Sequence, residues 1–319
     1  MIDANLSQAT ASAPATVSNV GVGFDILGFS LTGLSDRVTV RAIDAPEVRI
    51  GDIDGPHAGS VPDDAAHNTA SAALIALRQA RGLDGGFEVH ITKGVPLHSG
   101  LGGSAASAVA AVVAASALLE RPLTLSERAT FALAGEKAAC GQRKADNICP
   151  SMMGGMVLIR ALDPFDVVRI PVPQDMGAVV AIPDLDIEIQ QARAILQDSI
   201  ELDDYVAQSA NLAGFVAGCF SDDRALIARS LQDLIVEPQR SHLIPGFADV
   251  QRAAMDEGAM GASIAGAGPS LFALHDRHIE PGRLADAMAD AFADAGVDAT
   301  LLSSPIQGLA AHIVERHPS

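Results

Sequence analysis

The segment PLHSGLGGSAAS, residues 96–107, places three glycines and three serines directly before an alanine- and valine-rich run. Glycine lets a backbone approach a ligand closely and adopt a positive φ. A helix that begins just after such a loop points its free N–H groups and the positive end of its dipole at the loop. The pattern therefore predicts a phosphate site, with a helix from about Ser104 to Leu119 behind it. For a glycine loop alone, the alternative is a tight strand-to-helix turn that binds nothing.

Two common phosphate motifs do not match this loop. The P-loop needs a lysine after its last glycine, and no lysine follows a glycine anywhere in the chain. The dinucleotide fingerprint G-x-G-x-x-G fails at the loop, which reads G-x-G-G, and around Gly21, which lacks the third glycine. The charge of a nucleotide would then be balanced by the helix terminus and a metal ion. Mg²⁺ takes one or two protein oxygens beside the phosphates. The candidates are Ser104 and Glu136, although Glu136 alone also fits an ordinary solvated glutamate.

Alternating hydrophobicity and capping signals predict the elements that position these residues. Asn68 and Gly82 fit the two ends of one helix, and Thr124 with Glu127 fits a capping box at the start of another. We expect helices at 68–82, 104–119, 124–140, 203–219, 222–235, 245–258 and 281–296. We expect strands at 6–13, 26–43, 86–94, 166–173 and 177–184, a turn-rich segment at 14–25, a turn, an apolar segment and a strand within 146–160, and two strands around a glycine turn within 261–276.

Composition and charge narrow the class of protein. The 319 residues, 49% of them hydrophobic, suffice for two domains with full cores. A formal net charge of -18 argues against nucleic acid or an anionic membrane as partner, because either needs a basic face. The N-terminal segment has no Lys or Arg, unlike a signal peptide, and no apolar run is long enough to span a membrane. Three cysteines without CxxC spacing predict reduced thiols, so we expect a cytoplasmic protein.

Four segments together resemble one family, the GHMP kinases (galacto-, homoserine, mevalonate and phosphomevalonate kinases). PLHSGLGGSAASAVAA is similar to the family's second signature, roughly P-x-x-x-G-L-G-S-S-A-A, with Gly103 where a serine is usual. PATVSNVGVGFDILG (14–28) resembles the first motif in its homoserine kinase form, and GASIAGAGPSLFAL (261–274) resembles the C-terminal glycine loop. ADNICPSMMGG (145–155) resembles the homoserine kinase segment D-N-V-A-P-x-x-x-G-G, although CGQRKADN (140–147) departs from the usual residues before it.

The resemblance implies a fold and an activity. The fold would be α+β, the GHMP kinase fold, with a βαβ domain like domain 2 of ribosomal protein S5 at 1–165 and a ferredoxin-like domain at 166–319. The activity would be ATP-dependent phosphorylation of the hydroxyl of L-homoserine, as in threonine biosynthesis, by a cytoplasmic homodimer that uses ATP and Mg²⁺. The alternatives are another small substrate such as threonine, mevalonate or a sugar, or a ligand-binding relative that has lost catalysis.

By the same resemblance, the glycine loop would hold the nucleotide, and Ser104 and Glu136 would hold Mg²⁺. Gly266, Gly268 and Ser270 would form a third loop beside the substrate and the triphosphate. Such a site works mostly by positioning groups and neutralising charge. The nucleotide-binding residues would be Pro96, Leu97, His98, Ser99, Gly100, Leu101, Gly102, Gly103, Ser104, Ala105 and Ala106.

A zwitterionic amino acid needs a partner for each charge. The resemblance assigns its ammonium to Asp25, with Asn19 as a neighbouring contact. Its carboxylate falls to Arg193 and Arg240, since arginine binds carboxylates in a bidentate manner.

The catalytic set implied by the resemblance is Asn147, Asp146, Glu136 and Ser104. Asn147 would hydrogen-bond the hydroxyl that is phosphorylated. Asp146 would act as a base, unless the reaction uses none. Four histidines lie on different expected elements without ligand spacing, so we do not expect a metal or base site from them: His67, His90, His98 and His242.

Overall fold

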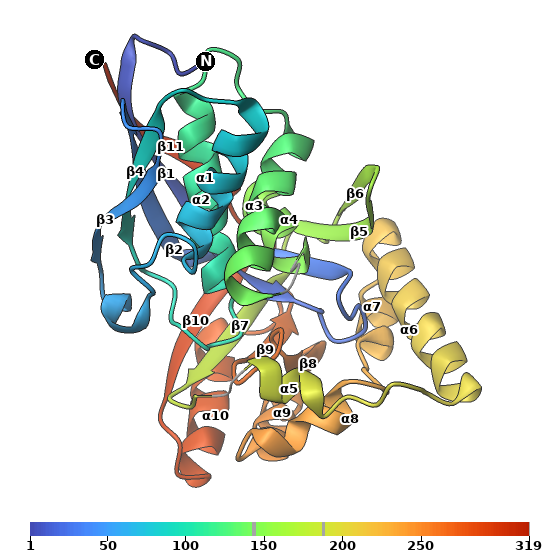
Figure 1. Cartoon of the computed structure of the whole chain (residues 1–319). Coiled ribbons are helices and arrows are strands. Elements are labelled where there is room, and N and C mark those ends of the chain that lie inside the picture. The colour runs from blue at the N-terminus through green and yellow to red at the C-terminus, as the bar shows by residue number, and fades with distance from the viewer. Residues whose placement is uncertain (142–144, 187–188, 319) are drawn as a thin grey trace.

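Two β-sheets organise the chain, whose computed structural model describes residues 1–141, 145–186 and 189–318 (Figure 1). The first sheet has seven strands in the order β11-β1-β2-β4-β3, with β5 paired to β2 and β6 paired to β5. Its strands are β1 (Leu6–Ser18), β2 (Leu27–Ile43), β3 (Val48–Asp54), β4 (Gly86–Thr92), β5 (Met156–Leu162), β6 (Phe165–Ile170) and β11 (His312–Pro318). The strand pair β3–β4 is parallel and is connected through helix α1 (Thr69–Arg81), which gives the predicted βαβ unit.

Four helices pack beside the first sheet (Figure 1). They are α1, α2 (Gly103–Ala117), α3 (Leu125–Cys140) and α4 (Ala145–Met153). Two predicted caps are confirmed. The Asn68 side chain accepts from the second residue of α1, with Gly82 left-handed at the other end, and Thr124 and Glu127 form a complete capping box on α3. These caps fix where both helices begin.

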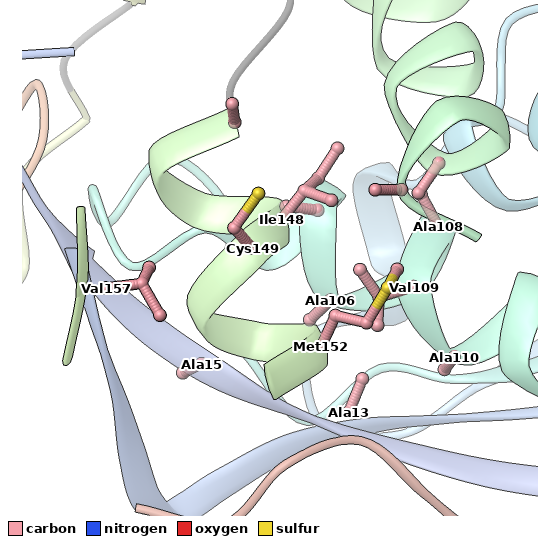
Figure 2. Close-up of a cluster of buried hydrophobic side chains, with 14 of the residues drawn as sticks. Ala13, Ala15, Ala106, Ala108, Val109, Ala110, Ile148, Cys149, Met152 and Val157 are labelled. Atoms are coloured by element: carbon pink, nitrogen blue, oxygen red, sulfur yellow. The ribbon is translucent and has the colours of Figure 1, made fainter. Parts of the chain in front are cut away.

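Helix α2 is the centre of the core. Every residue of α2 except Ser104 and Ala117 is buried, and most of them are alanine or valine. Small side chains let neighbouring elements approach closely, so the helix can be surrounded by the sheet, α1, α3 and α4. Figure 2 shows part of this cluster, with Ile148 and Met152 of α4 beside Ala106 and Val109 of α2, over Ala13 of β1.

The second sheet is antiparallel, in the order β10-β7-β9-β8, with α9 and α10 packed against it. Its strands are β7 (Gly177–Pro183), β8 (Gly261–Ile264), β9 (Leu271–His275) and β10 (Ala299–Pro305), and its helices are α9 (Phe247–Asp256) and α10 (Pro281–Asp294). The connection between β7 and α9 carries α5 (Ile189–Ala194), α6 (Leu202–Ser221), α7 (Arg224–Ser230) and α8 (Glu237–Arg240). No helix in the described ranges is long and apolar enough to cross a membrane.

The structure differs from the sequence prediction at several places. The helix predicted at 222–235 ends at Ser230, and strand β10 and the short helices α5 and α8 were not predicted. Residues 145–153, predicted as a turn and an apolar segment, form helix α4 with Pro150 inside it. The predicted strand 6–13 continues to Ser18, through a stretch that is buried on both faces and so shows no alternation. Strands β3 and β11 were not predicted, because most of their residues are partly or fully exposed and leave only a weak period-2 pattern.

The predicted division at residues 165 and 166 stays a prediction. The first sheet includes β6, which ends at Ile170, and the chain returns to this sheet with β11 beside β1. Both ends of the chain therefore belong to the first sheet, and the second sheet lies between them in the sequence.

Candidate active site

A cavity of about 570 Å³ is lined by segments that come from both sheets and from the connections between them. It brings together most of the residues singled out from the sequence. These are Asn19, Asp25, Pro96, Leu97, His98, Ser99, Gly100, Leu101, Gly102, Gly103, Ser104, Asp146, Asn147, Arg193, Arg240 and Gly266. Five others lie outside the lining. Ala105 and Ala106 are buried inside α2, Glu136 is buried on α3, Gly268 packs behind the glycine loop, and Ser270 is buried with its amide donating to the Ser99 carbonyl at 3.3 Å.

The glycine loop meets the cavity with its backbone. His98, Gly100 and Gly102 have φ values of 54°, 80° and 68°, so the chain passes three times through the left-handed region before α2. Gly102 occupies the N-cap position of α2 without a side-chain cap hydrogen bond within the described chain. The first N–H groups of α2 are therefore available to an anion in the cavity.

Two of the loop's glycines are required by close packing. A Cβ on Gly100 would lie 2.4 Å from the carbonyl oxygen of Ala265 and 2.7 Å from that of Gly268. The glycine loop of residues 96–107 therefore contacts the C-terminal glycine loop directly. A Cβ on Gly102 would lie 2.4 Å from Thr16 Oγ1 and 2.6 Å from Asn147 Oδ1. The loop is thus held against Asn147 as well as facing the cavity.

A buried ion pair lies beneath the same loop. Lys93 Nζ contacts Asp36 Oδ2 and also donates to the Gly103 carbonyl at 2.7 Å, and both side chains are almost completely buried. Asp36 also accepts from Ser107 Oγ at 2.6 Å and from the Val95 amide at 2.9 Å. The pair joins the end of β4 to the start of α2, which fixes the two ends of the loop.

The segment between β1 and β2 is strained in a way that the sequence did not reveal. Asn19, Val20 and Asp25 have φ values of 69°, 47° and 61°, although none is glycine and valine is β-branched. Local hydrogen bonds hold this conformation, because the Asp25 amide donates to Asn19 Oδ1 at 3.0 Å and the Gly23 amide donates to the Asn19 carbonyl at 2.8 Å. Backbone strain of this kind persists where the surroundings over-determine it, and it is concentrated at functional sites.

Opposite charges meet at this end of the cavity. Arg193 Nη1 lies 2.9 Å from Asp25 Oδ2, and both side chains are about half exposed. Arg240 is buried, and it donates from Nε to the Ala192 carbonyl at 2.9 Å and from Nη1 to the Gly266 carbonyl at 3.2 Å. Burial lowers the pKa of the Arg240 guanidinium, while the Asp25 carboxylate raises it. The two arginines and Asp25 form a compact site with both signs of charge.

Asp146 and Asn147 lie in the first turn of α4 and line the cavity. Thr16 Oγ1 donates to Asn147 Oδ1 at 2.8 Å, and Asn147 Nδ2 donates to Ser18 Oγ at 3.3 Å. Two hydroxyls of β1 therefore fix both ends of the amide. Asp146 is almost completely buried beside Asn147.

Ser104 and Glu136 suit Mg²⁺ by chemistry. Both are hard oxygen donors, and Ser104 lines the cavity at the first turn of α2. Glu136 is fully buried on α3, and a carboxylate is rarely so buried unless a cation or a hydrogen-bond donor accompanies it. Across the described ranges, no three His, Cys, Asp or Glu side chains group as a metal site.

Comparisons with known proteins identify the family. Residues 68–155 match the GHMP kinases N terminal domain, and residues 212–294 match the GHMP kinases C terminal domain. A homoserine kinase from Xanthomonas campestris pv. campestris (strain B100) is 46% identical over 97% of this chain and 95% of its own length. The crystal structure of a homoserine kinase from Cytophaga hutchinsonii superposes with a TM-score of 0.92 at 41% identity, covering 97% of this chain and 98% of that one.

The chain belongs to the homoserine kinases of the GHMP kinase family. A further homoserine kinase, from Xylella fastidiosa (strain 9a5c), is 48% identical over 83% of this chain and 81% of its own. The fold predicted from the four sequence segments is confirmed.

Several cavity residues of this homoserine kinase family member were missed in the sequence. Lys93 stands three residues before a loop that contains no lysine, and its position at the end of an alternating strand was the only signal. Ser18 and Phe24 line the cavity, and Thr16 lies behind it against Asn147. All three belong to the turn-rich segment, where no periodic pattern marks a side chain. The lining also includes Ser60, Val61, Pro62, His67, Asn68 and Thr69, of which Thr69 donates from Oγ1 to the Ser104 carbonyl at 2.9 Å.

Proposed function

We propose that this protein transfers the γ-phosphoryl group of ATP to the side-chain hydroxyl of L-homoserine, giving O-phospho-L-homoserine. The observation that carries the proposal is one cavity lined by two different groups of residues. One group is a helix N-terminus with a glycine backbone, and the other is a carboxylate with two arginines. The first group suits a polyphosphate and would form the nucleotide end, and the second suits a zwitterionic amino acid and would form the substrate end.

The nucleotide end would run along residues 96–104, with the phosphates against the backbone amides that begin α2. The nucleoside would occupy the part of the cavity lined by residues 60–62 and 67–69. Mg²⁺, when bound by Ser104 and Glu136, would neutralise developing charge on the transferred group. Lys93 would support the loop from below, since its charge is already paired with Asp36.

At the substrate end, the ammonium would bind Asp25 and the carboxylate would bind Arg193 and Arg240. Because Arg193 and Asp25 contact each other, each of them would exchange that contact for one with homoserine. Asn19 supports this end indirectly: it accepts from the Asp25 amide and donates from Nδ2 to the Gly266 carbonyl at 2.8 Å.

Asn147 would orient the attacking hydroxyl, because Thr16 and Ser18 hold its amide in one orientation at the junction of the two ends. Asp146 lies next to it in the cavity and would accept the proton of the hydroxyl. The alternative, in which the proton leaves late without a base, predicts that Asp146→Asn retains most of its turnover.

The test is ADP release with L-homoserine, L-threonine, mevalonate and galactose side by side, each with and without Mg²⁺. We expect turnover with homoserine and Mg²⁺ far above that with the other three. Faster turnover with mevalonate or galactose would contradict the amino-acid substrate, and nucleotide binding without turnover would favour a relative that has lost catalysis. A cytoplasmic homodimer completes the proposal, and its mass can be measured by light scattering.

A further inference from the structure

The Phe24 ring lies against both arginines of the substrate end. Its centroid is 5.5 Å from Cζ of Arg193 and 5.3 Å from Cζ of Arg240, which is within the range of cation–π contacts. Phe24 precedes Asp25 in the strained segment, whose hydrogen bonds to Asn19 fix the backbone on both sides of the ring. One aromatic side chain on a rigid loop therefore touches two cations.

Two guanidiniums that share a ring must also repel each other. Burial lowers the pKa of Arg240, and the charge of Arg193 adds to that lowering. The face of an aromatic ring carries negative potential, and its attraction for a cation increases as water is removed. Arg240 is only 4% exposed, so its contact with the ring is the better shielded of the two.

The two arginines are also connected through the backbone. Arg240 Nε donates to the carbonyl of Ala192, the residue directly before Arg193 on α5. Phe24 comes from the segment between β1 and β2, so its ring connects that segment to α5 and α8 through the two arginines. An aliphatic side chain of similar size would fill the space but would leave the two charges without the attraction of the ring.

We infer that Phe24 is a specificity-determining residue, whose ring holds the Arg193 and Arg240 guanidiniums together as one binding site for the carboxylate of the substrate. The inference rests on the proposed phosphorylation of homoserine and adds a positioning residue to it. Phe24 acts through the arginines, so its substitution should weaken the binding only of substrates that carry a carboxylate.

The experiment compares Phe24→Leu and Phe24→Met, which lack an aromatic face, with Phe24→Tyr, which keeps it. Each is assayed with L-homoserine and with 3-aminopropan-1-ol, which is homoserine without its carboxylate. We expect Leu and Met to raise the KM for homoserine about tenfold, as two lost cation–π contacts predict. The kcat, the KM for ATP and kcat/KM for 3-aminopropan-1-ol should stay within about twofold, and Tyr should restore the KM for homoserine. Phe220→Leu, at an exposed position on α6, is the matched control.

Two results would overturn the inference. One is a homoserine KM that stays within about twofold in both Phe24→Leu and Phe24→Met, and the other is an equal loss for both substrates, which would mean that the ring only shapes the cavity. If the wild-type enzyme shows no preference for homoserine over 3-aminopropan-1-ol, the result contradicts the proposed function itself. If the wild type shows this preference and the Phe24 variants keep it, the result contradicts only the role of Phe24.

Discussion

Lys93 and Asp36 form an ion pair, almost completely buried, directly beneath the glycine loop. The pair binds both ends of the loop, because Lys93 donates to the Gly103 carbonyl and Asp36 accepts from the Gly94 and Val95 amides. A buried pair contributes little net stability relative to apolar residues, but removing one partner leaves an unpaired charge in the interior.

Lys93→Met should therefore lower the free energy of unfolding by about 3–5 kcal/mol. The double variant with Asp36→Leu should recover part of that loss, because no unpaired charge remains. Urea unfolding measures both. Arg252→Met breaks an exposed pair with Asp249 at 2.9 Å and should change stability by less than about 1 kcal/mol. A Lys93 variant as stable as this control would contradict the cost expected for a buried charge that has lost its partner.

Gly102 and Gly103 provide a second pair of variants. Gly102→Ala places a Cβ at a φ of 68° and within 2.6 Å of Asn147 Oδ1. It should displace Asn147 and lower kcat by about tenfold or more, since small misplacements at a reacting centre are costly. Gly103→Ala meets Lys93 Nζ at 3.0 Å without a positive φ, so it should change kcat less. Equal kcat values for the two variants would place Asn147 outside the reaction.

More of the fold than of the contacts within the site could be predicted from the sequence. Capping residues and the alanine-rich α2 carry local signals, so their boundaries were predicted to within a residue or two. The four motif segments located most cavity residues. The contacts of Phe24 with Arg193 and of Thr16 with Asn147 join residues more than a hundred positions apart, and no local pattern encodes such contacts. The contacts of Lys93 with Asp36 and Gly103 likewise leave no periodic pattern in the sequence, so its role was overlooked.

Thr16→Val tests how Asn147 is positioned. The variant removes the hydroxyl that donates to Asn147 Oδ1 at 2.8 Å and keeps the shape of the side chain. Stability should fall by about 1 kcal/mol, the usual loss for one hydrogen bond. We expect kcat to fall about tenfold at an unchanged KM for ATP. Thr10→Val, on the same strand, removes a comparable bond to Thr39 at 2.8 Å and should leave kcat unaltered. Equal kcat losses in both variants would indicate general loosening of β1.

Glu136→Ala tests the proposed metal ligand. Loss of a group that holds Mg²⁺ should reduce kcat about a hundredfold or more and raise the Mg²⁺ concentration needed for half-maximal rate. Glu127→Ala, on the same helix, removes half of the capping box and should reduce stability by about 1 kcal/mol without changing the Mg²⁺ requirement. If the Glu136 variant keeps its rate and its Mg²⁺ requirement, its carboxylate has a purely structural role.

Substitution of the two arginines should have different effects on stability, because Arg193 is half exposed and Arg240 is buried. Arg193 is half exposed and pairs only with Asp25 among the ion pairs of the described residues, so Arg193→Ala should fold normally. Its KM for homoserine should rise about ten- to a hundredfold, because one charge-assisted hydrogen bond to the carboxylate is lost. Arg193→Lys should restore little of this KM, because lysine lacks the planar guanidinium. Arg240→Ala should raise the same KM and also lower the melting temperature, since the carbonyls of Ala192 and Gly266 lose a buried donor.

The KM for ATP decides whether these losses belong to the substrate end. It should remain within about twofold for Arg193→Ala, because Arg193 contacts Asp25 and Phe24, whereas ATP would bind at the glycine loop. L-Threonine, which carries the same two charges, should compete with homoserine in the wild type and compete more weakly in Arg193→Ala. Arg252→Ala, on the exposed face of α9, controls for the loss of a positive charge from a chain of net charge -18. If Arg193→Ala keeps its KM for homoserine while Arg240→Ala only unfolds more easily, the carboxylate does not bind here, and both arginines serve the fold.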